Sequence, residues 1–210
     1  MKRISSKKAK AKSKPRQNSN LDPPQLMAQP VFNRTLRFIN SQSGTRDIPL
    51  NSLDLFAALG CISLGGSSAN CIAYTAKVKR ISIWCTPKSD SDGAWQNVAI
   101  DWSNSTSFSS NKKVSDASIS NARPAHVSSK PPLESVCNFW LQGTSVQYAT
   151  ITCPLGAIVD INVSFTTCDS KGVHTQTIQG VQPLGTFFYG YLDESTRSVG
   201  FGLQPVDLPF

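Results

Sequence analysis

From residue 31 onward, hydrophobic and polar residues alternate along the chain in short runs. In residues 156–165, for example, polar residues separate Val159, Ile161 and Val163. Because neighbouring side chains of a strand point to opposite faces of a sheet, each run predicts a strand with one buried face. The runs that predict strands are residues 31–39, 71–85, 94–102, a short one around Val114–Ile119, 135–141, 147–153, 156–165, 172–178, 185–192 and 198–204.

The run at residues 71–85 changes phase partway along. Every second residue from Tyr74 to Val78 is apolar, whereas from Ile81 onward the apolar positions fall in the opposite phase. An extra residue in one strand of a pair shifts the alternation by one position. We therefore expect a bulge or bend near Lys79–Arg80.

One segment, residues 51–60 (NSLDLFAALG), has the pattern of a short helix. Asn51 is suited to cap its start, Asp54 lies near the positive end of the helix dipole, and Gly60 can end it. Elsewhere the strand runs follow one another through turn residues, without the strand–helix alternation of a parallel sheet. The fold class predicted is therefore all-β, an antiparallel sandwich or barrel with one short helix.

The N-terminal residues differ from the rest of the chain. In residues 1–20 the only large apolar residue after Met1 is Ile4, so this segment cannot bury enough surface to offset the entropy of ordering. Residues 21–30 (LDPPQLMAQP) contain three prolines, which stiffen the chain and oppose a helix. We expect two parts, a disordered basic arm with a proline-rich exit at residues 1–30 and a folded body at residues 31–210.

The first 20 residues of the arm carry the whole net charge of +8, because they contain eight cations and no anion. Removing its eight cations from the 21 Lys and Arg leaves 13, which the 13 Asp and Glu balance. Such a segment suits phosphates, in contacts that are independent of sequence and sensitive to salt. It contains no aromatic residue that could stack on bases. A nuclear import signal and a solvated tail without a partner are the alternatives. The predicted nucleic-acid-binding residues are Lys2, Arg3, Lys7, Lys8, Lys10, Lys12, Lys14 and Arg16.

Other chemistry has weaker support. His126 and His174 are the two histidines, and the serines of GGSSAN (65–70) lack the G-x-S-x-G pattern, so we expect no enzyme and no small-molecule substrate. No cysteine pair has zinc-ligand spacing. The chain shows no signal peptide and no membrane span, so we expect no membrane partner and six free, buried thiols. Calcium at a subunit contact is a weak candidate against ordinary surface turns, through Asp90 and Asp92 in SDSDG or Asp160, Asp169, Asp193 and Glu194.

Together these features resemble the coat protein of a small non-enveloped icosahedral virus, of the single jelly-roll class found in plant RNA viruses and small circular-DNA viruses. The stretches that carry the resemblance are KKAKAKSKPR followed by DPPQLMAQP, NSLDLFAALG before KVKRISIW, PAHVSSKPP, CPLGAIVDINVSF and GYLDES. The resemblance implies an eight-stranded jelly roll and a virion shell of many copies, whose arms point inward onto an RNA or DNA genome. It also implies synthesis in the host cytoplasm, with nuclear import through the arm as an option.

Two other classes of protein compete with this interpretation. A cellular nucleic-acid-binding β-barrel with a basic tail should carry a basic face on its body. The candidates for that face are Lys77, Lys79, Arg80, Lys112, Lys113 and Arg123, which acids offset in the sum. A carbohydrate-binding jelly roll would stack sugars on Trp95, Trp102 or Trp140, but it leaves the arm unexplained.

Overall fold

The computed structural model describes residues 30–85, 96–102, 112–119, 123–143, 145–167, 174–193 and 202–206. Apart from Pro30, the predicted arm lies outside these residues. Its disorder therefore stays a prediction.

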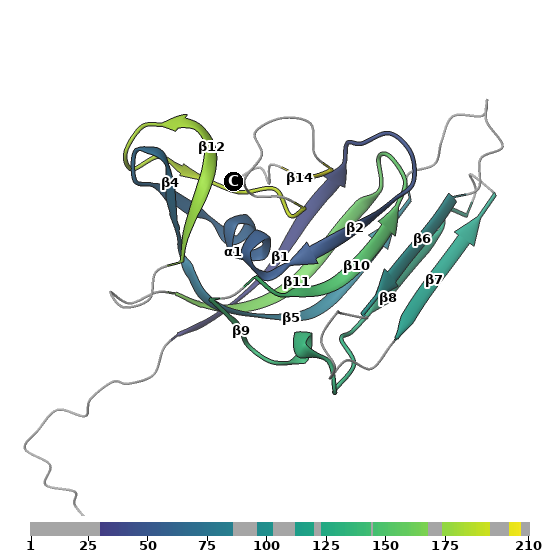
Figure 1. The fold of residues 1–210 in the computed structure, drawn as a ribbon. Coiled ribbons are helices and arrows are strands. Elements are labelled where there is room, and N and C mark those ends of the chain that lie inside the picture. Colours follow the sequence, from purple (N-terminus) through teal and green to yellow (C-terminus); the bar gives the residue numbers. More distant parts are fainter. Residues whose placement is uncertain are drawn as a thin grey trace, which may run out of the picture.

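Most of the described body is β-structure arranged in three sheets (Figure 1). Sheet A runs in the order β14 (Leu203–Pro205), β1 (Val31–Asn40), β11 (Ile158–Thr167), β5 (Ala73–Trp84) and β8 (His126–Ser129), with β9 (Leu141–Gln142) also on β5. Sheet B runs in the order β2 (Arg46–Asn51), β10 (Gln147–Cys153), β6 (Gln96–Asp101) and β7 (Lys113–Ser118). Sheet C runs in the order β12 (Thr175–Gln182), β4 (Gly66–Cys71), β3 (Cys61–Ser63) and β13 (Phe187–Phe188).

The strand pairing of sheets A and B is that of a jelly roll. Their eight principal strands pair as a nested hairpin, all antiparallel: β1 with β11, β2 with β10, β5 with β8 and β6 with β7. Two further antiparallel pairs, β11 with β5 and β10 with β6, join these units into two four-stranded sheets. A double sheet of eight antiparallel strands wound in this way is the jelly-roll arrangement. The predicted all-β, eight-stranded sandwich is confirmed.

The core lies between sheets A and B because the alternation turns one face of each strand inward. In the β1–β11 register, Leu36 lies opposite Ile161 and Phe38 opposite Val159, and all four are buried. The largest fully buried side chains are Trp102, Tyr148, Phe38, Phe56, Leu50, Leu55, Ile81, Ile83, Ile100, Ile151, Ile161 and Leu192.

The predicted irregularity in residues 71–85 is present and is a β-bulge. Val78 pairs with Val163 and Arg80 pairs with Asn162, so Lys79 is an extra residue in β5 without its own partner on β11. Val78 and Ile81 are buried on either side of the bulge, whereas Lys79 and Arg80 are both exposed. The bulge therefore turns two consecutive cations to the outer face of sheet A.

The predicted helix is α1 (Ser52–Leu59), which is almost entirely buried. Gly60 ends it with φ of 129°, a value that favours glycine. Asn51 makes no side-chain capping bond; its Nδ2 instead donates to Asp54 Oδ2 at 3.2 Å. The expected capping role of Asn51 was therefore wrong.

Several short segments differ from expectation. Residues 135–141 form the 3₁₀ turn η1 (Val136–Asn138) rather than a strand, because Ser135 bonds back to the Pro132 carbonyl and closes a tight turn after two prolines. Most of GGSSAN belongs to β4, in a stretch for which no strand was predicted. Residues 185–192 contribute only the two-residue β13. Sheet C, which lies beside α1 at one end of the sandwich, was not predicted (Figure 1).

One buried hydroxyl allows a stability prediction. Tyr148 is fully buried, and its Oη has no hydrogen-bond partner among the described residues. Burial, with smaller contributions from Cys137 and Asp54, raises the pKa of Tyr148 well above its usual value. Because a buried hydroxyl without a partner has lost its hydration, we expect Tyr148→Phe to raise the free energy of unfolding by about 1 kcal/mol in urea denaturation.

The matched control is Tyr189→Phe, since Tyr189 Oη accepts hydrogen bonds from both terminal nitrogens of Arg34 at 3.3 Å. This variant should show no gain in stability. A loss of about 1 kcal/mol in Tyr148→Phe would mean that the hydroxyl has a partner in solution, such as a buried water.

The buried thiols predict a loss of stability at high pH. The five described cysteines are free and buried, as expected, and Cys168 lies outside the described residues. Burial, reinforced by Cys85, raises the pKa of Cys153 from 9.0 to about 12, and burial raises those of Cys85 and Cys137 to about 11. Above pH 9 the unfolded thiol loses its proton while the folded thiol keeps it, so stability present below pH 9 falls as pH rises towards 12.

At pH 10 we expect Cys153 alone to lower the free energy of unfolding by about 1 kcal/mol relative to pH 8, measured by urea denaturation. Other groups also titrate in this range, so Cys153→Ala serves as the control. Between pH 8 and pH 10, the free energy of unfolding of Cys153→Ala should fall by about 1 kcal/mol less than that of the original protein. Equal drops in the two proteins would contradict the prediction.

Candidate nucleic-acid interface

The outer face of sheet A carries a concentration of positive charge. Its described strands present one carboxylate there, Asp160, and five cations that we call the basic face: Arg37, Lys77, Lys79, Arg80 and Lys130. The body is nearly neutral in its sum, but its charges are not evenly distributed. Cations and carboxylates nearly balance in the sequence of the body, but the fold places most cations of sheet A together on its outer face, with one carboxylate among its described strands.

The only acidic side chain on this face is occupied by its neighbour on β1. Arg37 Nε and Nη2 donate to the two carboxylate oxygens of Asp160, each at 2.7 Å. This two-pronged contact raises the pKa of Arg37, chiefly through the hydrogen bond and the charge of Asp160. The other four cations form no ion pair within the described part of the chain. They are available to an external anion.

These four cations surround a shallow pocket of about 480 Å³. Lys77, Lys79 and Arg80 come from β5, and Lys130 directly follows β8. The β5–β8 register pairs Ile81 with Ser129, which places Arg80 and Lys130 next to each other on neighbouring strands. The amide side chains that also line the pocket are Asn138 and Asn162, and its apolar side includes Pro131 and Leu133.

The pocket lies close to the residue at which the arm joins the body. Lys79 Nζ donates to Asn33 Oδ1 at 2.7 Å, and Ser164 Oγ donates to the same oxygen at 2.5 Å. Asn33 lies near the start of β1, immediately after the segment that carries the eight cations of the arm. The first residues of β1, to which the arm is joined, are therefore in contact with the basic face through Lys79.

An aromatic pair lies on the same face, farther along β5 and β8. Trp84 stacks on His126 with ring centroids 5.0 Å apart and an interplanar angle of 23°, and Trp84 is 36% exposed. Between this pair and the cations, Ser82 Oγ and Ser128 Oγ lie 2.8 Å apart. The outer face thus offers cations, hydroxyl groups and an accessible aromatic ring in one row.

Sequence reasoning found part of this site. It named Lys77, Lys79 and Arg80, which the bulge and the β5 register bring together. It missed Lys130, Trp84 and His126, which join them through the pairing of β5 with β8. Lys112 and Lys113 lie at the start of β7 in sheet B, away from this face, and Arg123 lies outside sheet A. The eight predicted residues of the arm lie outside the described residues.

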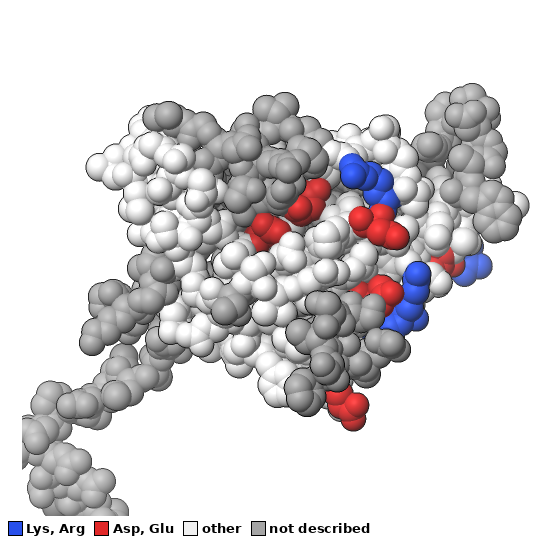
Figure 2. All heavy atoms as spheres, in the orientation of Figure 1, with Lys and Arg blue, Asp and Glu red and all other residues white. Residues whose placement is uncertain are grey.

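The side of the molecule that carries β2 and β10 has a mixture of acidic and basic side chains. Figure 2 shows Asp and Glu side chains spread among Lys and Arg side chains on this side. On the outer surface of β2, Asp47 Oδ1 accepts a hydrogen bond from Thr152 Oγ1 on β10 at 2.5 Å. Among the described residues, a polyanion would meet no comparable run of cations on this side (Figure 2).

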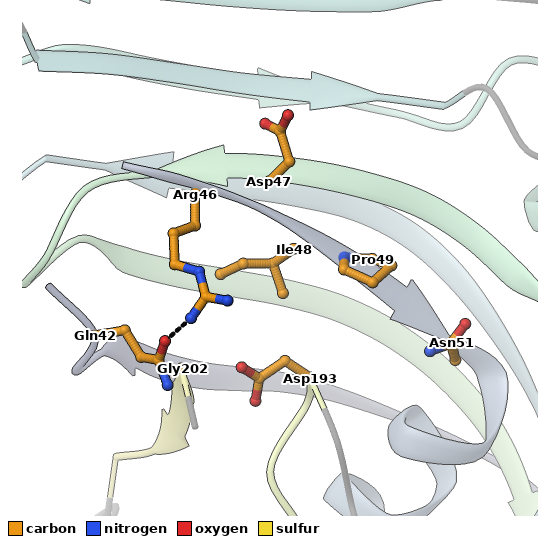
Figure 3. A pocket seen from close by; sticks show the side chains of 8 residues that line it. All are labelled: Gln42, Arg46, Asp47, Ile48, Pro49, Asn51, Asp193 and Gly202. Atoms are coloured by element: carbon orange, nitrogen blue, oxygen red, sulfur yellow. Dashed lines mark hydrogen bonds between the residues drawn. The ribbon is translucent and has the colours of Figure 1, made fainter. Parts of the chain in front are cut away.

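A second pocket, of about 330 Å³, contains the calcium candidate Asp193 together with Arg46, Gln42 and Gly202 (Figure 3). The Arg46 guanidinium extends towards Gln42 and donates to its Oε1, whereas Asp47 points away from the pocket. Calcium requires six to eight oxygen ligands, and a guanidinium in the pocket opposes a cation.

No cluster of three or more His, Cys, Asp or Glu side chains suited to a metal occurs within the described ranges. Asp160, a further calcium candidate, is held by Arg37. The candidates that lie outside the described residues are Asp90, Asp92, Asp169 and Glu194. Calcium binding therefore stays a prediction.

The remaining candidates from the sequence have structural roles where they are described. His174 lies between the rings of Phe56 and Tyr74, with centroids 4.8 and 5.6 Å away. Trp102 was a candidate for stacking on sugars, but it is fully buried, so that prediction was wrong. Trp140 is 44% exposed, and Trp95 lies outside the described residues. None of the helices in the described part of the chain is long and apolar enough to cross a membrane.

The fold and the charges define an all-β jelly-roll protein with a cationic N-terminal segment and a basic sheet face. No protein-family model matches the chain, and no curated protein matches its sequence. Among solved structures, the chain is similar to the cryo-EM structure of an extra small virus (XSV) VLP of the giant freshwater prawn, Macrobrachium rosenbergii. The identity is 13% and the TM-score is 0.48, over 81% of this chain and 96% of that chain. The jelly-roll assignment rests on the strand pairing described above.

Proposed function

We propose that the protein is the coat protein of a small non-enveloped icosahedral virus. Many copies assemble into a closed shell, and the arm packages an RNA or DNA genome through contacts with phosphates. The observation that carries this proposal is the joining of eight cations, without an anion among them, to the first strand of an eight-stranded jelly roll. The jelly roll is a fold of viral capsid domains.

The distribution of charge supports this division between arm and body. Each arm binds phosphates weakly on its own, but many arms held together by a shell act with avidity. A body in which 13 Lys and Arg are nearly balanced by 12 Asp and Glu avoids strong repulsion between neighbouring copies. The virion is then the location of the protein, with synthesis in the host cytoplasm and nuclear import through the arm as a further use of the same cations.

Exposed apolar side chains support self-association. On sheet C, Phe187 lies opposite Ile62, both are exposed, and Leu64 and Leu184 are exposed nearby. A second group, around η1, consists of Leu133, Phe139 and Trp140. Exposed apolar groups of this kind mark contact surfaces. Two different patches on one chain suit head-to-tail contacts, which close into rings when the rotation allows.

A cellular nucleic-acid-binding β-protein with a basic tail is the alternative function. The basic face favours it, because such a protein should carry cations on its body as well as on its tail. Both functions include binding to nucleic acid, and they differ in whether the chain assembles.

Electron microscopy of the purified full-length protein, with light scattering in solution, tests the proposal. We expect closed particles of uniform diameter, with nucleic acid inside when it is present during assembly. Monomers or dimers at low and high salt, with nucleic acid present, would overturn the coat-protein function and leave the cellular alternative. A variant that combines Ile62→Asp with Phe187→Asp should prevent assembly, while an Ile119→Asp variant, at an exposed residue beyond both patches, serves as the control.

A further inference from the structure

We propose that the basic face is a second nucleic-acid-binding site, which acts without the arm and takes single-stranded nucleic acid. Lys77, Lys79, Arg80 and Lys130 hold phosphates, and Trp84 stacks on a base. This inference rests on the proposed function only in taking nucleic acid as the partner; it requires no assembly.

The phosphate contacts follow from the charges on sheet A. Four cations line one pocket and form no ion pair in the described part of the chain, while Arg37 occupies the one carboxylate of the face. Two of these cations are consecutive residues turned outward by a bulge, an arrangement that regular alternation does not produce. Such a cluster on one face has the electrostatic features of a polyanion site.

The base contact follows from Trp84. Four residues of strand separate Arg80 from Trp84, which is about 13 Å along β5. A strand held by its phosphates at the pocket can therefore reach the indole ring with a nearby base. His126 supports the other face of the ring and fixes its orientation, so the exposed side of Trp84 is preformed for stacking.

The preference for single strands follows from the same geometry. Stacking on an aromatic ring requires a base that is free of its partner, and a sheet surface cannot enter a duplex to reach one. The hydroxyl of Ser128, which is exposed and hydrogen-bonded to the buried Ser82, lies between the ring and the cations and can bond to the sugar–phosphate backbone. The contact between Lys79 and Asn33 places this surface near the residues through which the arm is joined to β1.

The test uses full-length protein in which the eight cations of the arm are replaced by Gln. Binding of a fluorescent 20-nucleotide poly(U) or poly(dT) strand, and of a duplex of equal length, is measured by anisotropy at several salt concentrations. We expect this protein to retain measurable, salt-dependent binding to the single strand. Further replacement of Lys77, Lys79, Arg80 and Lys130 by Gln should reduce the slope of log K against log salt by about 3 and lower affinity at least about tenfold at low salt.

Two comparisons separate this site from a general effect of charge. Replacing Lys112, Lys113 and Arg123 by Gln in the same arm-neutral background removes cations elsewhere and should leave the affinity nearly unchanged. Trp84→Ala should weaken single-strand binding about tenfold but leave duplex binding unchanged. Trp84→Phe should retain most of the single-strand affinity, because it keeps an aromatic ring. Circular dichroism and thermal melting confirm that each variant is folded.

Loss of all binding in the arm-neutral protein would overturn the inference and leave the arm as the nucleic-acid site. Equal losses in the basic-face and control variants would also overturn it, as would equal effects of Trp84→Ala on single strands and duplexes. Failure of the original protein to bind nucleic acid at all would instead overturn the proposed function.

Discussion

Replacing the eight cations of the arm by Gln should remove most of the affinity of the protein for nucleic acid. For single strands, each phosphate neutralised contributes about 0.7 to the slope of log K against log salt, so eight contacts predict a slope lower by about 6. The original protein should lose about 10³–10⁵ in affinity between 50 and 200 mM salt. Anisotropy titrations with a fluorescent single strand, repeated over that range, measure both quantities.

The matched control for this prediction is an arm of the same composition in shuffled order. Two of the eight cations are Arg and the rest are Lys, so bidentate phosphate contacts are a small part of the binding. A shuffled arm should therefore bind as tightly as the original. A large loss of nucleic-acid affinity on shuffling would show that the order of residues matters, and it would contradict binding through phosphate charge alone.

The largest loss of stability should come from Trp102→Ala. Trp102 is fully buried in the core, and its Nε1 donates to Ser129 Oγ at 3.0 Å. The substitution leaves a large cavity and removes this bond between the end of β6 and β8, which predicts a loss of about 3–5 kcal/mol in the free energy of unfolding. That is a large share of the about 5–15 kcal/mol that stabilises an ordinary domain, and urea denaturation measures it directly.

Trp140→Ala provides the comparison, because Trp140 is 44% exposed and its removal opens no core cavity. We expect a change of less than about 1 kcal/mol there. Trp102→Phe should fall between the two variants, since it keeps most of the apolar volume but loses the bond to Ser129. Similar losses in Trp102→Ala and Trp140→Ala would contradict the arrangement of the core.

Local pattern was sufficient to predict most strands and the bulge, because both are properties of alternation along a single run. The phase change around Lys79 is visible in the sequence, and its position agrees with the register of β5 and β11. The 3₁₀ turn η1 was missed because its apolar residues resemble a strand, while the proline carbonyl that closes the turn lies just before it. In sheet C, β12 and β13 pair with β4 and β3, which lie more than one hundred residues away, as in the bond between Thr175 and Asn70.

The candidate site was harder to predict than the fold for the same reason. Lys130 and Trp84 lie 46 residues apart in the sequence and share a face only because β5 pairs with β8. The 13 Lys and Arg and 12 Asp and Glu of the body sum to only +1. This sum hides the cluster, since it contains no information on which strands are neighbours. The arm, in contrast, could be recognised directly because its eight cations all lie within residues 2–16 of the sequence.

The pairing of β1 with β11 also determines when the protein can fold. Asn33 and Ser164 bond across 131 residues of sequence, so the first strand to leave the ribosome pairs with the last of the eight principal strands. At synthesis rates of about 5–20 residues per second, β1 waits roughly ten seconds for its partner. Folds dominated by such distant pairings also fold slowly, in about milliseconds to seconds. The cationic arm precedes β1 in the sequence, so it leaves the ribosome well before the body has closed.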